Sequence, residues 1–377
     1  MIILKYCVLF PKAENVHLIK DVGMFAYKLH KLYGVESKVA CLNNGSYPYL
    51  DTEVKGLKLD FIERKYKNEI MCGCRYLKKN SRNIDVLQIF HVTLGSVIYT
   101  RIYKRLNKKG KIFLKLDCTE ELIKKIQELK GIKKSIFDYL FKNVNIIGVE
   151  QKALFESLCK LLPQYQEKIQ WIPNGIDYNG NINFESYNYD MKENIFITVG
   201  RIGSEEKRID LMFEAFERFV SNSKENWKLE IVGPIIKEFN SYIEKYFLKY
   251  PLLKDSIILK GEIQDRESLF SEYKKAKIYL CTSAYESFGI AMLEAAAFGN
   301  VLISTDVGIA RELIDEKNGK ILYEANTENI AVSMLALVKD KSIKEKSNSI
   351  YNLCKDKYDM DLIVTNLYRK VCGEGNA

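Results

Sequence analysis

The chain has few of the residues that build metal sites or covalent cross-links. Only three of its 377 residues are histidines, and neither His-x-x-x-His nor Cys-x-x-Cys occurs, so no zinc site or other metal site is expected. The nine cysteines are an odd number, and only Cys72 and Cys74 lie close together in the sequence. This pattern indicates reduced thiols rather than the disulfide framework of a secreted protein.

Long apolar runs are also missing. No stretch approaches the roughly 18 uninterrupted apolar residues that a membrane-spanning helix needs. The apolar N-terminal run is interrupted by Lys5 and ends at Pro11, which predicts a buried strand rather than a signal peptide. A composition of 47% hydrophobic and 28% charged residues excludes a disordered chain. We therefore expect a soluble, cytoplasmic protein that is long enough for two domains.

The net charge of +9 is unevenly distributed. Residues 1–170 hold 31 Lys and Arg against 17 Asp and Glu, whereas the remainder holds 27 against 32. Segments 65–82 and 101–115 are the most basic, and the second has the mixed apolar and basic pattern of an interfacial helix. A basic half predicts peripheral contact with an anionic membrane at its inner face, or a polyanionic acceptor, unless it is a solvated lysine-rich face. No nucleic-acid-binding motif accompanies the charge, so nucleic acid is not an expected partner.

Apolar strand-like segments alternate with helix-length segments from end to end. Strands that are apolar throughout and separated by helices predict parallel sheets covered on both faces. The expected fold class is α/β, with two doubly wound, Rossmann-like domains facing a central cleft. The expected strands are 2–10, 37–42, 57–62, 85–92, 111–117 and 143–149, then 195–200, 229–233, 256–261, 277–282, 300–305 and 319–324.

A polar stretch rich in Gly, Asn and Tyr interrupts this alternation at 168–190. We predict an N-terminal domain at 1–172 and a second domain at 173–357. Residues 358–377 are predicted to pack back on the N-terminal domain as the last of three closing helices (327–339, 341–356 and 361–372).

Two cations follow the first strand of the second half. Arg201 and Lys207 lie in a short loop between that strand and an amphipathic helix. Because an arginine fork, a lysine and a helix N-terminus all bind phosphate oxygens, the pair is suited to a diphosphate. Alternatively, Glu205 and Glu206 neutralise both cations in an ordinary loop.

Two carboxylates lie around a later strand-to-helix junction. Glu286 ends the strand segment, and Glu294 follows in the next helix. The amides of Phe288, Gly289, Ile290 and Ala291 lie at the helix start, where N–H groups are available to a phosphate. A carboxylate at Glu294 suits the two hydroxyls of a ribose. The alternative is a helix with stabilising acidic residues near its N-terminus.

In this order, the Gly-Arg loop with its lysine and the Glu-x7-Glu motif resemble glycosyltransferase family 4. This family contains metal-independent, retaining, sugar-nucleotide-dependent enzymes of the GT-B fold. Further segments resemble the family's landmarks, although Asn300 replaces a usual proline and Ile309 a usual glycine. These landmarks are 172–177, Val307-Gly308 with Glu312, Asn318-Gly319 and 358–373.

The resemblance implies that the domain at 1–172 binds the acceptor and that the domain at 173–357 binds the nucleotide-sugar donor. It also implies roles for the donor-side residues. Arg201, Lys207 and the amides of residues 288–291 would neutralise the donor diphosphate. Glu294 would hold the ribose, and Glu286 would contact the donor sugar near its anomeric carbon.

The first half offers weaker candidates. Gly23 would let the backbone approach the donor phosphate, or is only conformational. His91, at a strand end, would contact a sugar on the acceptor side or is structural. Asp117 would bind the acceptor or cap the helix that starts at Thr119. Asp359-Met360-Asp361 mimics a metal-binding Asp-x-Asp motif, but helix capping explains it better.

The predicted function is transfer of a hexose, with retention, from a UDP-sugar or GDP-sugar to a cell-envelope glycan, lipid or protein. No cofactor is expected. The alternatives are a nucleotide-sugar epimerase or hydrolase of the same fold and a non-catalytic partner subunit of a transferase, although such a subunit would be expected to lack the four charged donor residues.

Overall fold

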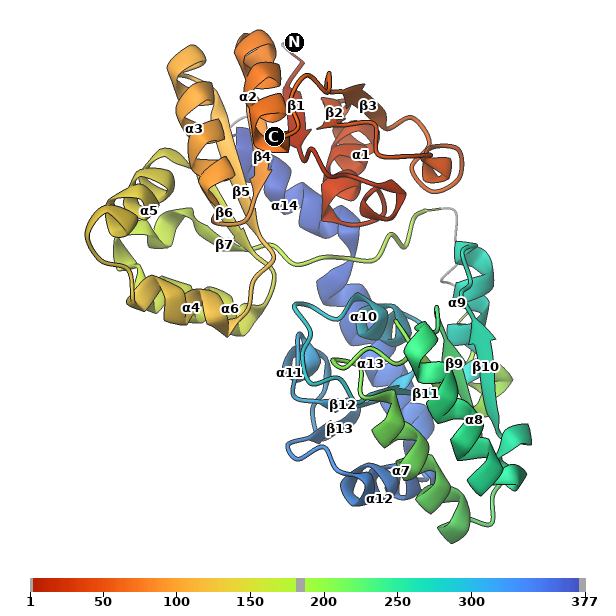
Figure 1. Ribbon diagram of the computed structural model, residues 1–377. Helices are drawn as coiled ribbons and strands as arrows, with labels where there is room; N and C mark the ends of the chain where they lie inside the picture. The colour runs from red at the N-terminus through yellow and green to blue at the C-terminus, as the bar shows by residue number, and fades with distance from the viewer. Residues whose placement is uncertain (1–2, 181–186, 373–377) are drawn as a thin grey trace. The chain divides into compact units, whose positions relative to one another are not determined.

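The computed structural model describes residues 3–180 and 187–372, which form two compact units. The first unit comprises residues 1–181 together with 360–377, and the second comprises 182–359. Each unit is built around its own parallel sheet (Figure 1).

The first unit contains a seven-stranded sheet with the order β3-β2-β1-β4-β5-β6-β7. Every strand pair in this sheet is parallel. The strands are β1 (Lys5–Leu9), β2 (Glu36–Cys41), β3 (Lys58–Phe61), β4 (Val86–Phe90), β5 (Lys111–Leu116), β6 (Ile146–Val149) and β7 (Ile169–Trp171).

Helices cover both faces of the first sheet, because successive side chains of a strand point to opposite faces. Tyr6 and Val8 of β1 pack with α1 (Asp21–Tyr33) and α14 (Met360–Cys372). Cys7 and Leu9 face the opposite core, which is closed by helices from the middle of the unit. These helices are α2 (Glu69–Asn80), α3 (Leu94–Leu106), α4 (Glu120–Gln127), α5 (Gly131–Asn143) and α6 (Lys152–Leu161).

A buried ion cluster fixes α14 to the first unit. Lys28 of α1 is fully buried, and its Nζ lies 2.5 Å from Asp177 Oδ1 and 2.7 Å from Asp361 Oδ1. The amide of Met360 also donates to the carbonyl of Ile176. Residues 173–180 therefore group with the first unit, so its boundary lies later in the chain than the predicted residue 172. Residues 373–377 of the predicted closing segment lie outside the described residues.

The second unit contains a six-stranded parallel sheet with the order β10-β9-β8-β11-β12-β13. Its strands are β8 (Glu193–Val199), β9 (Lys228–Val232), β10 (Ile257–Gly261), β11 (Ala276–Cys281), β12 (Val301–Thr305) and β13 (Gly319–Leu322). One face packs on α7 (Ile209–Asn222), α8 (Asn240–Lys249) and α12 (Thr327–Val338). The remaining helices of the unit are α9 (Arg266–Lys275), α10 (Ile290–Ala297), α11 (Ala310–Leu313) and α13 (Ile343–Tyr358).

The predicted α/β class with two Rossmann-like sheets is confirmed. Each of the expected strand segments overlaps an observed strand, and β7 is an additional edge strand that the pattern missed. Its three residues are too few to produce a readable apolar run. Within the described residues, no helix combines the length and hydrophobicity that a membrane crossing requires.

Candidate functional site

The candidate donor residues lie where the strand order of the second sheet reverses. The chain passes from β8 through β9 to β10 at one edge and then returns to β11 on the other side of β8. In doubly wound sheets, ligands bind beyond the carboxyl ends of the two strands at such a switch point. Arg201 and Lys207 follow β8, and Glu286 follows β11, so the predicted residues meet at this point.

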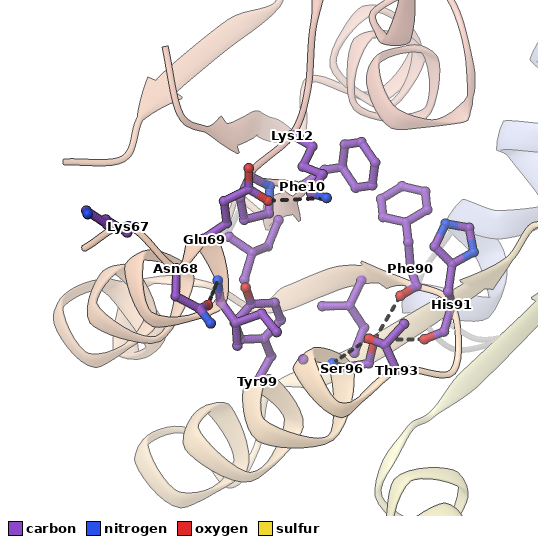
Figure 2. Close-up of a pocket in the computed structure, with 15 residues that line it drawn as sticks. Phe10, Lys12, Lys67, Asn68, Glu69, Phe90, His91, Thr93, Ser96 and Tyr99 are labelled. Atoms are coloured by element: carbon purple, nitrogen blue, oxygen red, sulfur yellow. Dashed lines mark hydrogen bonds and ion pairs between the residues drawn. The ribbon is translucent and has the colours of Figure 1, made fainter. Parts of the chain in front are cut away.

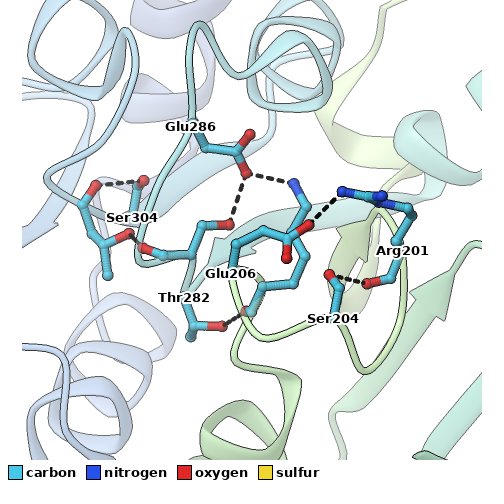
Figure 3. A network of polar contacts seen from close by, with 9 residues as sticks. Arg201, Ser204, Glu206, Thr282, Glu286 and Ser304 are labelled. Carbon is cyan, nitrogen blue, oxygen red and sulfur yellow. Dashed lines mark hydrogen bonds and ion pairs between the residues drawn. The ribbon is translucent and has the colours of Figure 1, made fainter. Parts of the chain in front are cut away.

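A polar network joins the two loops (Figure 3). Lys207 Nζ lies 2.5 Å from Glu286 Oε1, and the hydroxyl of Ser283 donates to the same oxygen at 2.7 Å. Both members of the ion pair are about one-fifth exposed, with 21% and 18% of their side chains accessible. The lysine and the glutamate are thus held together but remain open to a ligand.

Arg201 is placed differently from Lys207. Its Nη2 lies 2.6 Å from Glu206 Oε1, and its side chain is 71% exposed. The pairing expected of an ordinary loop is therefore present for this arginine. Its guanidinium has further N–H donors, because one carboxylate oxygen occupies only part of the fork.

Backbone contacts fix the loop that carries Lys207. The hydroxyl of Thr282 donates to the carbonyls of Lys207 and Arg208, at 2.9 and 3.1 Å. The amide of Ala284 donates to the carbonyl of Glu206 at 2.7 Å. The loops after β8 and β11 are thus tied to each other, which holds Lys207 beside Glu286 without the need for a ligand.

The N-terminus of α10 supplies amide donors near this network. Gly289 is the N-cap and has a φ of 92°, a conformation that favours glycine. Ile290 and Ala291 begin the helix, so their amides have no intrahelical acceptor four residues back. The amide of Ile309 donates to the carbonyl of Phe288, and a Cβ on Gly308 would lie 2.3 Å from that carbonyl oxygen. The turn before α10 is therefore fixed by close backbone packing.

Glu294 is buried and engaged by side chains of α9. Its Oε1 lies 2.7 Å from Arg266 Nη2, and its Oε2 accepts from the hydroxyl of Tyr273 at 3.2 Å. Burial and the neighbouring Glu294 raise the pKa of Tyr273 well above its ordinary value, so this phenol stays protonated as a donor. Each carboxylate oxygen retains a second lone pair for a hydroxyl donor.

In the first unit, His91 lies at the corresponding switch point. The strand order reverses between β1 and β4, and a pocket of about 610 Å³ lies at their carboxyl ends. Figure 2 shows His91 at the margin of this pocket, with the starts of α2 and α3 nearby. The floor is mainly apolar and aromatic, and Lys12, Asn68 and Glu69 form part of its polar edge.

The backbone at His91 is left-handed, with a φ of 58°, which is uncommon for a residue other than glycine. Its amide donates to the carbonyl of Lys115, and its carbonyl accepts from the hydroxyl of Ser96 at 2.7 Å. Such strain is typical of residues held for a function.

Gly23 and Asp361 have structural roles, whereas Asp117 does not cap α4. A Cβ on Gly23 would lie 2.1 Å from the carbonyl oxygen of Leu18, so the glycine serves close packing at the start of α1. Asp117 is exposed, and the hydroxyl of Thr119, not Asp117, accepts from the amide of Glu121 to cap α4. Asp361 pairs with the buried Lys28, and Asp359 directly precedes α14, so the capping interpretation of this motif stays a prediction.

Sequence reasoning missed Ser283, Arg266 and Tyr273, the side chains that hold the two glutamates. Ser283 lies three residues before Glu286, a local signal that was available. Arg266 and Tyr273 come from another helix, and only the fold brings them to Glu294. Among residues 3–180 and 187–372, no group of three or more His, Cys, Asp or Glu side chains is arranged to hold a metal ion.

Comparisons with known proteins find glycosyltransferases among the proteins similar to this chain. Residues 180–353 match the family model described as glycosyl transferases group 1. An uncharacterized glycosyltransferase of Methanocaldococcus jannaschii is 28% identical over 231 residues, which are 58% of this chain and 56% of that protein. A poly(glycerol-phosphate) alpha-glucosyltransferase of Bacillus subtilis is 25% identical over 244 residues, which are 63% of this chain and 34% of that protein. The chain thus spans about half the length, or less, of these two curated relatives.

Among solved structures, the Anabaena protein HepE in complex with UDP and glucose is similar in fold. Its TM-score is 0.70 at 13% identity, and the match covers 98% of this chain and 99% of that one. A glycosyltransferase from Rickettsia africae has a TM-score of 0.74 at 15% identity and is matched over the full length of both chains. Residues 180–353 are thus similar to glycosyl transferases group 1, and the chain shares its fold with solved glycosyltransferases of the GT-B type.

Proposed function

We propose that this chain is a retaining hexosyltransferase of glycosyltransferase family 4. It moves a hexose from a UDP-sugar or GDP-sugar to a glycan, lipid or protein acceptor of the cell envelope, and it needs no metal ion. The observation that carries this proposal is the contact between Lys207 and Glu286 at the switch point of the second sheet.

The chemistry rests on neutralising the leaving group. A nucleoside diphosphate gains negative charge as the bond to the sugar breaks, and fixed cations and amide donors stabilise that charge. Lys207, Arg201 and the amides at the start of α10 are assigned this role. The diphosphate would replace the carboxylates that now pair with the two cations.

The remaining donor contacts belong to the two glutamates. Glu286, released from Lys207, would accept a hydroxyl of the donor sugar. Glu294 would accept the ribose hydroxyls through its second lone pairs, while Arg266 and Tyr273 hold its orientation. The pocket beside His91 is assigned to the acceptor side.

Two of the comparisons support the substrates. HepE was solved with UDP and glucose, which supports a uridine nucleotide and a hexose. The Bacillus subtilis relative is named an alpha-glucosyltransferase, and an α product formed from an α-linked donor retains configuration.

The test is turnover with a panel of UDP-sugars and GDP-sugars, each with and without glycan, lipid and protein acceptors, in the presence of a metal chelator. We expect one donor to release its nucleoside diphosphate in an acceptor-dependent way. Reaction of the donor without any acceptor would indicate the epimerase or hydrolase alternative. No reaction with any combination of donor and acceptor would contradict the proposed transferase activity.

Substitutions in the polar network of the second unit test whether its cations take part in the reaction. Lys207→Met and Arg201→Met should each lower kcat/KM by about 10- to 100-fold, because a charge-assisted hydrogen bond contributes about 1.5–3 kcal/mol. Arg218→Met is the matched control, since Arg218 is a half-exposed arginine of the same unit that pairs with Glu328 on the α7–α12 face. An equal loss of kcat/KM in the control would contradict the assignment of Lys207 and Arg201 to the diphosphate.

A further inference from the structure

Helix α5 of the first unit exposes apolar side chains along one stripe. Ile132, Ile136 and Tyr139 are 80%, 39% and 36% exposed. Their spacing of four and three residues places them on one side of the helix. Phe137, Leu140 and Phe141 are buried in the core and anchor the helix. The α5 stripe, meaning Ile132, Ile136 and Tyr139, therefore points away from its own core.

The start of α5 is accessible from all sides. Residues 130–136 are all exposed, although they lie in or next to a helix. A solvent-facing stripe of two isoleucines and a tyrosine is costly in water unless something covers it.

Lysines flank the α5 stripe in the sequence. Residues 124–142 contain six lysines and only two acidic residues, Glu128 and Asp138. Every one of these lysines is exposed. Lys134 pairs with Asp138 at 3.0 Å, which leaves the segment with a clear positive excess around its apolar side chains.

The basic segment at 101–115, which had the pattern of an interfacial helix, does not provide such a surface. Tyr103 is fully buried and donates its hydroxyl to the carbonyl of Ile84. Ile102 packs against the core. The interfacial interpretation of that segment is therefore wrong, because its apolar side chains are used inside the unit.

We propose that the α5 stripe and its lysines dock the protein on an anionic lipid bilayer. The apolar side chains would enter the boundary between headgroups and acyl chains, and the lysines would meet anionic headgroups, as in other interfacial helices. Exposed apolar side chains combined with nearby lysines favour the interface of an anionic bilayer over an uncharged surface, which would leave the lysines without anionic partners. This docking goes beyond the proposed transfer reaction, because the residues assigned to that reaction lie in the second unit and at the pocket beside His91, not on α5.

The test is sedimentation of the full-length chain with vesicles of phosphatidylcholine alone and of phosphatidylcholine mixed with phosphatidylglycerol. We expect binding to the mixed vesicles that weakens as salt shortens the screening length. Ile132→Asp/Ile136→Asp should weaken partitioning at least about tenfold. Lys133→Gln/Lys134→Gln should weaken it about fivefold per lysine.

A matched control uses Leu248→Asp/Leu252→Asp in the second unit, where both leucines are more than four-fifths exposed. This pair should bind vesicles as the unmodified protein does. A tryptophan at position 132, in Ile132→Trp, should show a blue-shifted emission with mixed vesicles only.

Three outcomes overturn the proposal: equal binding by Ile132→Asp/Ile136→Asp, equal loss in the leucine control, or no binding at any salt. If the isoleucine variant instead abolishes self-association in solution, a second copy covers the stripe and the bilayer does not. Nucleotide binding, measured on the same variants, reports separately on the proposed transfer reaction.

Discussion

Lys192 shows how one buried residue makes the second unit sensitive to pH. Its Nζ donates to the carbonyls of Tyr273, Lys274 and Ala276, and no carboxylate pairs with it among the described residues. Burial lowers the pKa of Lys192 from 10.5 to about 7. The amine therefore binds its proton more weakly in the folded unit than in the unfolded chain.

The sign of the pH dependence follows from this pKa. Between pH 7 and 10.5 the unfolded chain holds a proton that the folded unit releases, so stability rises with pH in that window and is lowest below it. Lys192→Met should remove up to about 3 kcal/mol of the rise between pH 7 and 9. Urea unfolding at several pH values measures this rise in the free energy of unfolding. An unchanged pH profile in the variant would show that Lys192 is not its cause.

The sequence predicted which residues belong to the site better than it predicted which of them contact each other. Lys207 and Glu286 lie far apart in the sequence, and only their positions after β8 and β11 predicted that they meet. The burial of Glu294 against Arg266 was not readable, because no local pattern links α9 to α10. Gly23 was ambiguous for another reason: the sequence does not show that the carbonyl of Leu18 lies where a Cβ would be.

At the scale of elements, the backbone at the end of β8 packs closely against a glycine in the loop that follows β9. Gly233 follows β9 with a φ of 139°, and a Cβ there would lie 1.8 Å from the carbonyl oxygen of Gly200. Gly200 precedes Arg201, so any displacement would move the candidate diphosphate loop.

Gly233→Ala should therefore destabilise the second unit by about 3 kcal/mol or more and weaken nucleotide binding. Gly261→Ala is the matched control, because Gly261 also has a positive φ, of 71°, but a Cβ there meets open space. The control should lose only about 1 kcal/mol. Thermal unfolding compares them, and similar losses in both would show that backbone strain, not the contact with Gly200, dominates.

Most elements were predictable because their strands are buried on both faces and read as apolar runs. The three closing helices also lie within two residues of their predicted bounds, as α12 (Thr327–Val338), α13 (Ile343–Tyr358) and α14 (Met360–Cys372). β7 was not predictable, since Ile169–Trp171 lies at the sheet edge within a polar segment. The exposed stripe on α5 was not predictable either. This helix has apolar side chains on two faces, and the sequence pattern does not show which face packs in the core.

At the scale of the whole molecule, the closing helix is part of the first unit. α14 contributes Met360, Ile363, Val364, Leu367 and Val371 to the core beside α1. The buried Lys28 joins this helix to the segment before residue 180 through Asp361 and Asp177. Burial would lower the pKa of Lys28, but its two carboxylate partners raise it, so the ammonium stays charged.

Lys28→Met should destabilise the first unit by about 3–5 kcal/mol, because it leaves two partly buried carboxylates without their cation. Lys31→Met, on the same helix but exposed, should change stability by less than about 1 kcal/mol. Calorimetric unfolding of the full-length variants measures both. A small loss in Lys28→Met would mean that α14 is held by its apolar contacts alone.

The account as a whole depends on a diphosphate binding at Lys207, Arg201 and the start of α10. Calorimetric titration of UDP and of GDP into the full-length protein and into Lys207→Met and Arg218→Met tests this most directly. The account predicts one site for one nucleotide, about 10- to 100-fold weaker in Lys207→Met and unchanged in Arg218→Met. Binding of neither nucleotide, or equal binding by Lys207→Met and the unmodified protein, would contradict it.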